Sequence, residues 1–426
     1  MALATVSTPW YRMDNASVMY SAIQREDYSA IYRFSAFMDR EVDPAALQRA
    51  VDRAMPRFPG FAVRIRRGFF WHYFEPNPSP GPFVREDSAD FCRPVRFGED
   101  NGWLVRFLHY GRRISLEVFH AVADGAGALV FFRALLAEYL RQLGEDIPAG
   151  CAVDLDSPPS PGELEDAYRR HAGRVSRSFT QVKRAYQDLG TPEPFYTFNV
   201  TMGFVPIAQL KERASALGGT VTEYLSAVLI KLLLEKQRQE RVHRQRPVAL
   251  GIPVNLRPYF PTETLRNFIM TVQVSADPRL GDYSLPELVS LVRCQMRLYA
   301  TPQNLRAVMT RGVKLQYNPL LQLIPSVLKN PIMLRSYRTS GVRPYTATFT
   351  NPGYFALPPE MSAHIEHMEV ILGQAAVARP HISAIGYGGT MEITFSGTQQ
   401  ENDLEREFFR YLVREGMHVR VESTRG

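Results

Sequence analysis

The sequence predicts a mixed α/β protein of two domains, each a mixed β-sheet flanked by helices. Three observations favour this fold class. The chain has 426 residues, too many for one ordinary core, since a domain has roughly 150 residues. Strand-like and helix-like segments are interspersed in both halves, with no exact repeat between them. The polar stretch "DLDSPPSPGELED" at 154–166, with three prolines, separates the halves.

The first half opens with a predicted strand, "YRFSAFM" at 32–38. A helix should follow at about 43–56, because Asp43 can cap it, Pro44 suits its first position and Pro56 ends the pattern. A long helix is expected from about 125 to 143, where apolar residues recur every three or four positions. Four strand candidates lie between these helices: "FAVRIRR" (61–67), "FFWHYFE" (69–75), "WLVRFLHY" (103–110) and "RISLEVFH" (113–120).

The second half repeats this mixture. A crossover helix is predicted from Glu163 to Leu189, and a later helix is marked by the capping-box pair Thr220 and Glu223. Two or more helices are expected between Leu285 and Leu334. A final helix covers 401–416, and the strand candidates are "FNVTMGFV" (198–205), "PVALGIPVNL" (247–256), "NFIMTVQVS" (267–275), "YTATFTN" (345–351), "HIEHMEVIL" (364–372) and "ISAIGYGGTMEITFSGT" (382–398).

These elements place the N-terminal domain at 1–155, a linker with the crossover helix at 156–197, and the C-terminal domain at 198–426. The net charge of +7 favours an anionic small molecule or carrier, whereas the scattered arginines argue against nucleic acid as a partner.

Cellular location is constrained by what the sequence lacks. The three cysteines have no disulfide or zinc spacing, and the first residues do not resemble a secretory signal. The most apolar stretch, "YNPLLQLIPSVLKNPIML" at 317–334, is interrupted by polar residues and prolines, which is typical of a lid or an interfacial helix rather than a transmembrane segment. We therefore expect a cytoplasmic protein.

The stretch "RISLEVFHAVADGAG" at 113–127 contains the most informative residues. In a strand, His120 lies on the same apolar face as Val118, so the imidazole should be partly desolvated and neutral at pH 7. Asp124 stands where a helix cap belongs, and Gly125 leaves the backbone uncovered. On these residues alone, a core histidine followed by a cap and a turn is the simpler interpretation. A histidine and an aspartate are too few for a metal site, and none is expected.

Together, "HAVADG" reads HxxxDG and resembles the motif of the CoA-dependent acyltransferase superfamily, which includes chloramphenicol acetyltransferase, plant BAHD acyltransferases, wax-ester synthases and peptide synthetase condensation domains. Three later stretches resemble motifs of the condensation-type members, in the same order. They are "IPVNLRPYFPTETLRNFIMTV" with Asn255, Arg257, Asn267 and Phe268, "TFTNPG" with Thr350, Asn351 and Gly353, and "ISAIGYGGTMEITFSGT" with Tyr387 and Gly389.

This resemblance implies two chloramphenicol acetyltransferase-like domains with an active-site tunnel between them. It implies that His120 is the general base for direct attack of an acceptor hydroxyl on a thioester, without an acyl-enzyme. Asp124, paired with Arg257, and Gly125 are implied to be structural. The oxyanion or tunnel residues are implied to be Thr350, Asn351, Gly353 and Tyr387.

The expected donor is acyl-CoA, and the acceptor a small-molecule alcohol. No bound cofactor is implied, and the residues that bind the donor are not identified. Phe119 occupies the place of the second histidine of condensation domains, and the DFGWG motif of the plant enzymes is missing, so the sequence more closely resembles the bacterial alcohol acyltransferases. Two alternatives remain: condensation with an acyl-phosphopantetheine carrier or transfer to an amine, and a catalytically silent binding domain on the same fold.

Overall fold

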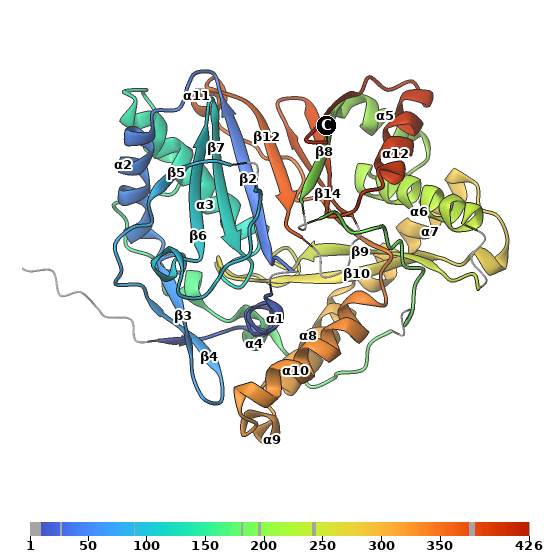
Figure 1. Cartoon of the computed structure of the whole chain (residues 1–426), viewed down its shortest axis with the longest axis horizontal. Helices are drawn as coiled ribbons and strands as arrows, with labels where there is room; N and C mark the ends of the chain where they lie inside the picture. Colours follow the sequence, from blue (N-terminus) through green and yellow to red (C-terminus); the bar gives the residue numbers. More distant parts are fainter. Residues whose placement is uncertain are drawn as a thin grey trace, which may run out of the picture.

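Two large β-sheets, each covered by helices, organise the molecule (Figure 1). The computed structural model describes residues 10–25, 28–88, 90–179, 182–194, 197–240, 244–374 and 380–425. The first sheet has five strands in the order β12 (Ile365–Leu372), β2 (Ile31–Met38), β7 (Arg113–Phe119), β6 (Val105–Tyr110) and β5 (Val84–Glu86). Helices α2 (Pro44–Ala54) and α3 (Gly125–Gln142) pack against each other and share a core with this sheet.

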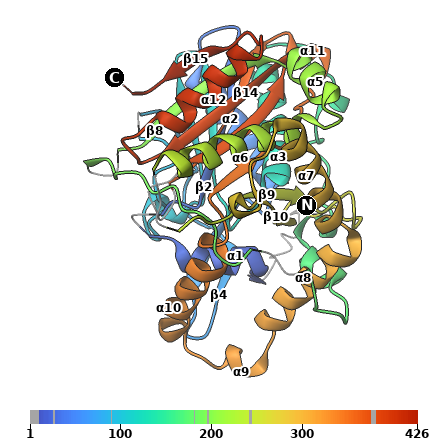
Figure 2. The same ribbon diagram turned by 90° about the vertical axis from the view of Figure 1, so that its right-hand side faces the viewer.

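The second sheet has seven strands, and helices cover one of its faces (Figure 2). The order is β10 (Ile269–Ala276), β9 (Val248–Asn255), β11 (Ala347–Thr350), β13 (His381–Tyr387), β14 (Thr390–Gly397), β8 (Asn199–Pro206) and β15 (Arg420–Ser423). Strand β11 runs parallel to β9 and β13, and the other pairs are antiparallel. The helices that share its core are α5 (Ile207–Ala216), α6 (Val221–Gln239), α7 (Leu285–Tyr299) and α12 (Asp403–Arg414).

Strand β12 connects the two halves of the chain. It follows β11 in sequence, and α11 (Pro359–Ser362) lies between them. Yet β12 pairs with β2 at the edge of the five-stranded sheet, while its neighbours in sequence, β11 and β13, belong to the seven-stranded one. The C-terminal half therefore contributes an edge strand to the N-terminal sheet. The sequence pattern did not predict this pairing.

The remaining elements form the lower part of the molecule in Figure 1. A small sheet has the order β1 (Tyr11–Arg12), β4 (His72–Pro76) and β3 (Val63–Arg67). The helices of this part are α1 (Asn15–Ile23), α4 (Ala167–His171), α8 (Pro302–Gln316), α9 (Pro319–Gln322) and α10 (Ser326–Tyr337).

The helix ends confirm the predicted capping residues. Asp43 caps α2, with Pro44 at its first position, and Thr220 and Glu223 form a reciprocal capping box at the start of α6. Helix α3 begins at Gly125 with Asp124 as its cap. The predicted mixed α/β class and these helix starts are therefore observed.

The predicted crossover helix from Glu163 to Leu189 was wrong. Only a 3₁₀ turn at Pro161–Leu164 and the short α4 form there, and the described residues from 172 to 189 have no helix. Side chains of α8 accept hydrogen bonds from backbone N–H groups of this segment. Thr310 accepts from the N–H of Gly173, and Asn304 accepts from the N–H of Phe179.

Within the described residues, no single helix is long and apolar enough to cross a membrane. The pair α5 and α6 passes by length and composition together but is bent by 77°. Most apolar side chains of α6 are buried in the core of the seven-stranded sheet.

The first turn of α3 touches the chain that leads into β10. A Cβ atom added to Gly127 would lie 2.0 Å from the carbonyl oxygen of Leu265, far inside van der Waals contact. At Gly125, an added Cβ would meet Phe34 at an ordinary 3.5 Å. The close approach therefore occurs at Gly127, two residues beyond the motif, and brings α3 against the C-terminal half.

We expect Gly127→Ala to lower the free energy of unfolding by about 1–3 kcal/mol, because the added methyl group overpacks this contact. In an unobstructed helix the same change stabilises by up to about 1 kcal/mol, so the sign is diagnostic. Urea unfolding followed by circular dichroism measures it. Gly150→Ala, with open space around its Cβ, is the control and should be nearly neutral; equal stability of the two variants would contradict the contact.

Candidate active site

His120 directly follows strand β7 and is held between two tyrosine rings. Its backbone N–H donates to the carbonyl oxygen of Ala30 at 2.7 Å, which keeps the residue beside β2. The imidazole stacks on Tyr20 of α1, with ring centroids 4.3 Å apart, and meets Tyr32 of β2 edge-on at 4.9 Å. The ring is half-buried, so its orientation is fixed by packing on both sides.

Asn267 determines which nitrogen of His120 holds the proton. The amide Nδ2 donates to the carbonyl oxygens of His120, at 2.8 Å, and Ala121, at 3.4 Å. A carbonyl oxygen only accepts, so this network orients the amide with Oδ1 facing the imidazole, 3.1 Å from Nδ1. Because Oδ1 also only accepts, Nδ1 must donate. In the neutral ring, Nε2 then keeps its lone pair.

Burial lowers the pKa of His120 below its ordinary value of 6.5. Desolvation is the largest influence. Its own backbone carbonyl, the carboxylate of Asp124 and the side chain of Asn267 act in the opposite direction. The imidazole is therefore neutral at pH 7, with Nε2 able to accept a proton.

Asp124 uses both carboxylate oxygens to fix the turn that follows His120. Oδ1 accepts from the backbone N–H of Gly127 at 2.9 Å, as a helix cap does. Oδ2 accepts from the backbone N–H of Phe268 at 2.7 Å and from Nη1 of Arg257 at 2.9 Å. Since the Asp124 side chain is fully buried, this ion pair is largely shielded from solvent.

Arg257 belongs to the segment between β9 and β10, and its guanidinium ties that segment together. Nε and Nη2 donate to the carbonyl oxygen of Thr264, at 3.1 and 2.9 Å, and Nη2 also donates to that of Arg266 at 2.9 Å. The same segment supplies Asn267. One stretch of the C-terminal half thus holds both the imidazole and the cap of α3.

Thr350 is the last residue of β11, and Asn351 and Gly353 lie in the turn that follows it. The Asn351 side chain is occupied, because Nδ2 donates to Oγ1 of Thr222 at 3.1 Å and Oδ1 accepts from the backbone of Gly353 at 2.8 Å. Phe349 is buried in the helical core of the seven-stranded sheet, so Thr350 lies on the opposite face. None of these residues hydrogen-bonds to His120 in the part of the chain that the structure describes.

Tyr387 and Phe119 are packing residues in this structure. The hydroxyl of Tyr387 donates to the carbonyl oxygen of Ile365 at 3.2 Å, joining β13 to β12, and burial raises the pKa of this phenol to about 12. Phe119 is fully buried and packs edge-on against Phe97. A histidine at position 119 would lie in the core rather than beside His120.

Ser17, Tyr20 and Tyr32 are site residues that sequence reasoning missed. The hydroxyl of Ser17 donates to the carbonyl oxygen of Ala121 at 2.6 Å, and that of Tyr32 to Ala123 at 3.0 Å. They support the histidine turn from α1 and β2, more than 80 residues earlier in the chain. No local sequence signal marks them, because only the folded arrangement brings them to the turn.

The described residues contain no cluster of three or more histidines, cysteines or acidic residues able to hold a metal ion. In "HIEH", His364 lies 3.1 Å from the carboxylate of Asp39, and the ring of His367 stacks on Phe37. These contacts give His364 a hydrogen-bonding role and His367 a packing role.

No protein-family model matches the sequence, and no curated protein matches it by sequence. Among solved structures, polyketide synthase associated protein 5 from Mycobacterium tuberculosis has a TM-score of 0.64 and 18% identity, covering 96% of this chain and 97% of that one. Trichothecene 15-O-acetyltransferase TRI3 from Fusarium sporotrichioides has a TM-score of 0.60 and 11% identity, covering 97% and 98%.

The starter condensation domain of rhizomide synthetase, solved with C8-CoA and Leu-SNAC, has a TM-score of 0.58 and 14% identity, covering 96% of this chain and 95% of that one. These similarities span nearly the whole chain. They show that the chain has the two-lobed fold of condensation domains and of the chloramphenicol acetyltransferase-like superfamily, which confirms the predicted fold.

We expect Asp124→Ala to lower the free energy of unfolding by roughly 3–5 kcal/mol, because Arg257 loses its carboxylate partner while remaining mostly buried. The yield of soluble protein should fall with it. Asp43→Ala is the matched control, since Asp43 also caps a helix but is exposed; it should cost only about 1 kcal/mol. Equal losses in denaturant unfolding would show that Asp124 acts only as a cap.

Proposed function

We propose that this chain, which has the fold of condensation domains and of a trichothecene acetyltransferase, is an acyltransferase that moves an acyl group from acyl-CoA to the hydroxyl of a small-molecule acceptor. The observation that supports this most directly is the state of His120. Its Nδ1 lies 3.1 Å from Oδ1 of Asn267, and burial lowers its pKa, so we infer a neutral ring at pH 7 with Nε2 left as a base. The fold alone would suit a silent domain equally well, so the proposal depends on this arrangement.

In the proposed reaction, Nε2 of His120 removes the proton from the acceptor hydroxyl as its oxygen attacks the thioester carbonyl. A tetrahedral intermediate forms, and its C–S bond then breaks. The departing thiolate receives the proton from His120, which returns the imidazole to its starting state. Asn267 positions the ring by holding Nδ1–H through both proton transfers.

The oxyanion of the intermediate requires a hydrogen-bond donor. The hydroxyl of Thr350 is our preferred candidate, because Asn351 already bonds to Thr222 and the backbone N–H of Gly353 is used within the turn. We assign Asn351 and Gly353 to shaping this turn. Tyr387 is assigned to packing rather than to contact with substrate.

Direct transfer is favoured over an acyl-enzyme. In the described part of the chain, the only side chain that hydrogen-bonds to the imidazole is that of Asn267, an amide rather than a serine or cysteine nucleophile. Such a nucleophile would need to lie within hydrogen-bond distance of its base.

We expect His120→Ala to reduce release of free thiol from acyl-CoA, in the presence of an alcohol pool, by about 10²–10⁴-fold. Thiol release is followed with a chromogenic disulfide, and the product is identified by mass spectrometry. His418→Ala, an exposed histidine, is the control and should retain full activity.

Undiminished release in His120→Ala would contradict the mechanism. Absence of turnover with every donor, and of any rise in melting temperature with CoA, would instead support a silent domain. Two comparisons decide between this proposal and its alternatives. The same acyl group is offered on CoA and on a phosphopantetheine carrier to identify the donor, and alcohols are compared with amines to identify the acceptor.

The pH dependence should reflect the lowered pKa of His120. The neutral imidazole is the active form, so kcat/KM should be flat above pH 7 and fall with acid, with a midpoint below 6.5. Asn267→Ala should move this midpoint lower, because the bond to Asn267 is one of the influences that raise the pKa, and it should also lower the plateau. An acid limb centred above 6.5 would contradict this assignment.

A further inference from the structure

An exposed apolar surface covers the lower end of the molecule, where α9 and α10 project in Figures 1 and 2. We call it the apolar face. Its most exposed side chains are those of Val327, 80% accessible, and Leu320, 76%. It consists of Phe69, Trp71, Leu320, Leu323, Val327, Leu328 and Ile332. Groups of large apolar side chains that lie exposed together mark interaction sites in soluble domains.

Hydrogen bonds join the two segments of the apolar face into one surface. The backbone N–H of Ser326, at the start of α10, donates to the carbonyl oxygen of Phe69 at 2.8 Å. The hydroxyl of Ser326 bonds to Gly68 at 3.1 Å, and Nζ of Lys329 donates to Phe70 at 2.8 Å. The β3–β4 turn and α10 therefore present their apolar side chains together, although about 250 residues separate them.

Positive charge accompanies this surface. Residues 288–359, which include α8, α9 and α10, contain nine lysines and arginines and no aspartate or glutamate. The excess of the whole chain, 50 basic against 43 acidic residues, therefore resides in this segment. Among the described residues, none of these nine cations forms an ion pair with a carboxylate. Exposed examples are Arg335, in the last turn of α10, and Arg338, which directly follows that helix.

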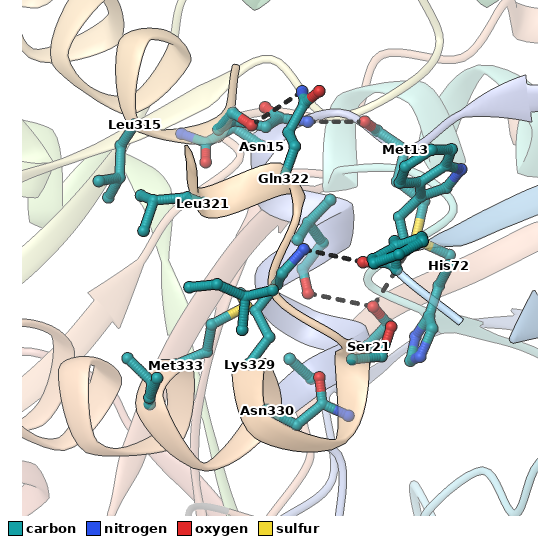
Figure 3. A pocket seen from close by; sticks show the side chains of 18 of the residues that line it. Met13, Asn15, Ser21, His72, Leu315, Leu321, Gln322, Lys329, Asn330 and Met333 are labelled. Atoms are coloured by element: carbon teal, nitrogen blue, oxygen red, sulfur yellow. Dashed lines mark hydrogen bonds between the residues drawn. The ribbon is translucent and has the colours of Figure 1, made fainter. Parts of the chain in front are cut away.

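An apolar pocket of about 410 Å³ opens beside the apolar face (Figure 3). In Figure 3, Leu321 and Met333 of the helical side lie across from Met13 and His72. Trp71 and Ile332 belong both to the pocket lining and to the apolar face, so the two are continuous. Helix α1 forms another wall of the pocket. Tyr20 of the same helix stacks on His120, so α1 lies between the pocket and that histidine.

We propose that the apolar face docks on the surface of an anionic lipid bilayer, with lipid acyl chains reaching the mouth of this pocket. Apolar side chains flanked by unpaired cations are the composition that binds to membrane interfaces. A second copy of the chain is disfavoured, because it would bring two uncompensated positive surfaces together. This inference does not depend on the acyl-transfer reaction.

The test uses vesicles of phosphatidylcholine alone and of phosphatidylcholine with phosphatidylglycerol, and measures the bound fraction by flotation. The protein should bind the anionic vesicles, and the bound fraction should fall as the salt concentration rises. The double variant Arg335→Gln/Arg338→Gln should bind them about 25-fold less tightly, at roughly fivefold for each arginine. A chain that binds neither vesicle, or both equally at all salt concentrations, overturns the proposal.

The apolar contribution is tested with Leu323→Glu/Val327→Glu, which should reduce binding by about tenfold or more. Both residues are exposed, so the melting temperature should not change. Leu280→Glu, 82% exposed on the C-terminal half, is the control and should bind as the unmodified protein does. An equal loss of vesicle binding in Leu323→Glu/Val327→Glu and in Leu280→Glu would contradict membrane docking. So would a protein dimer that is dissociated by Leu323→Glu/Val327→Glu and not by Leu280→Glu.

The depth to which the apolar face enters the bilayer is measured by tryptophan fluorescence, with lipids brominated on their acyl chains. Trp71 lies at the pocket mouth, so brominated vesicles should quench its emission, and Trp71→Phe should lose the quenched component. Binding without quenching of Trp71 would indicate that the protein attaches by another surface.

Discussion

The buried ion pair between Asp124 and Arg257 is the interaction on which the rest of the site depends. Asp124 caps α3, the main helix of the N-terminal core, while Arg257 gathers the chain between two strands of the C-terminal sheet. The same carboxylate accepts from the backbone of Phe268, next to Asn267. The ion pair therefore sets the distance between the imidazole of His120 and the amide that orients it. A charge pair of this kind, at the junction of two sheets, couples folding to site geometry.

Much of the fold was predictable because its signals are local. Capping residues such as Asp43 and Thr220 mark helix starts, since backbone N–H groups there need an acceptor. The alternating pattern before His120 placed it at a strand end, as observed. The pairing of Asp124 with Arg257, implied by the family resemblance, is present at 2.9 Å.

The remaining features depend on contacts between distant segments. The crossover helix was wrong because α8 side chains satisfy the backbone that a helix would have used. The pairing of β12 with β2 of the N-terminal sheet could not be predicted, since the pattern of a strand does not specify its partner strand. Tyr20 stacks on His120 only because α1 is packed there, and Gly127 is required by an approach that sequence does not show. The resemblance to a known motif thus singled out His120 as the proposed base, whereas the contacts that orient its ring come from the tertiary fold.

The central claim is that His120 is neutral at pH 7 with the proton on Nδ1. Nitrogen-15 NMR of the protein with labelled histidine measures this directly, and the His120 resonances are assigned by their loss in His120→Ala. We predict a protonated Nδ1 and an unprotonated Nε2 for this ring at pH 7. A proton on Nε2, or an imidazolium with both nitrogens protonated, would contradict it.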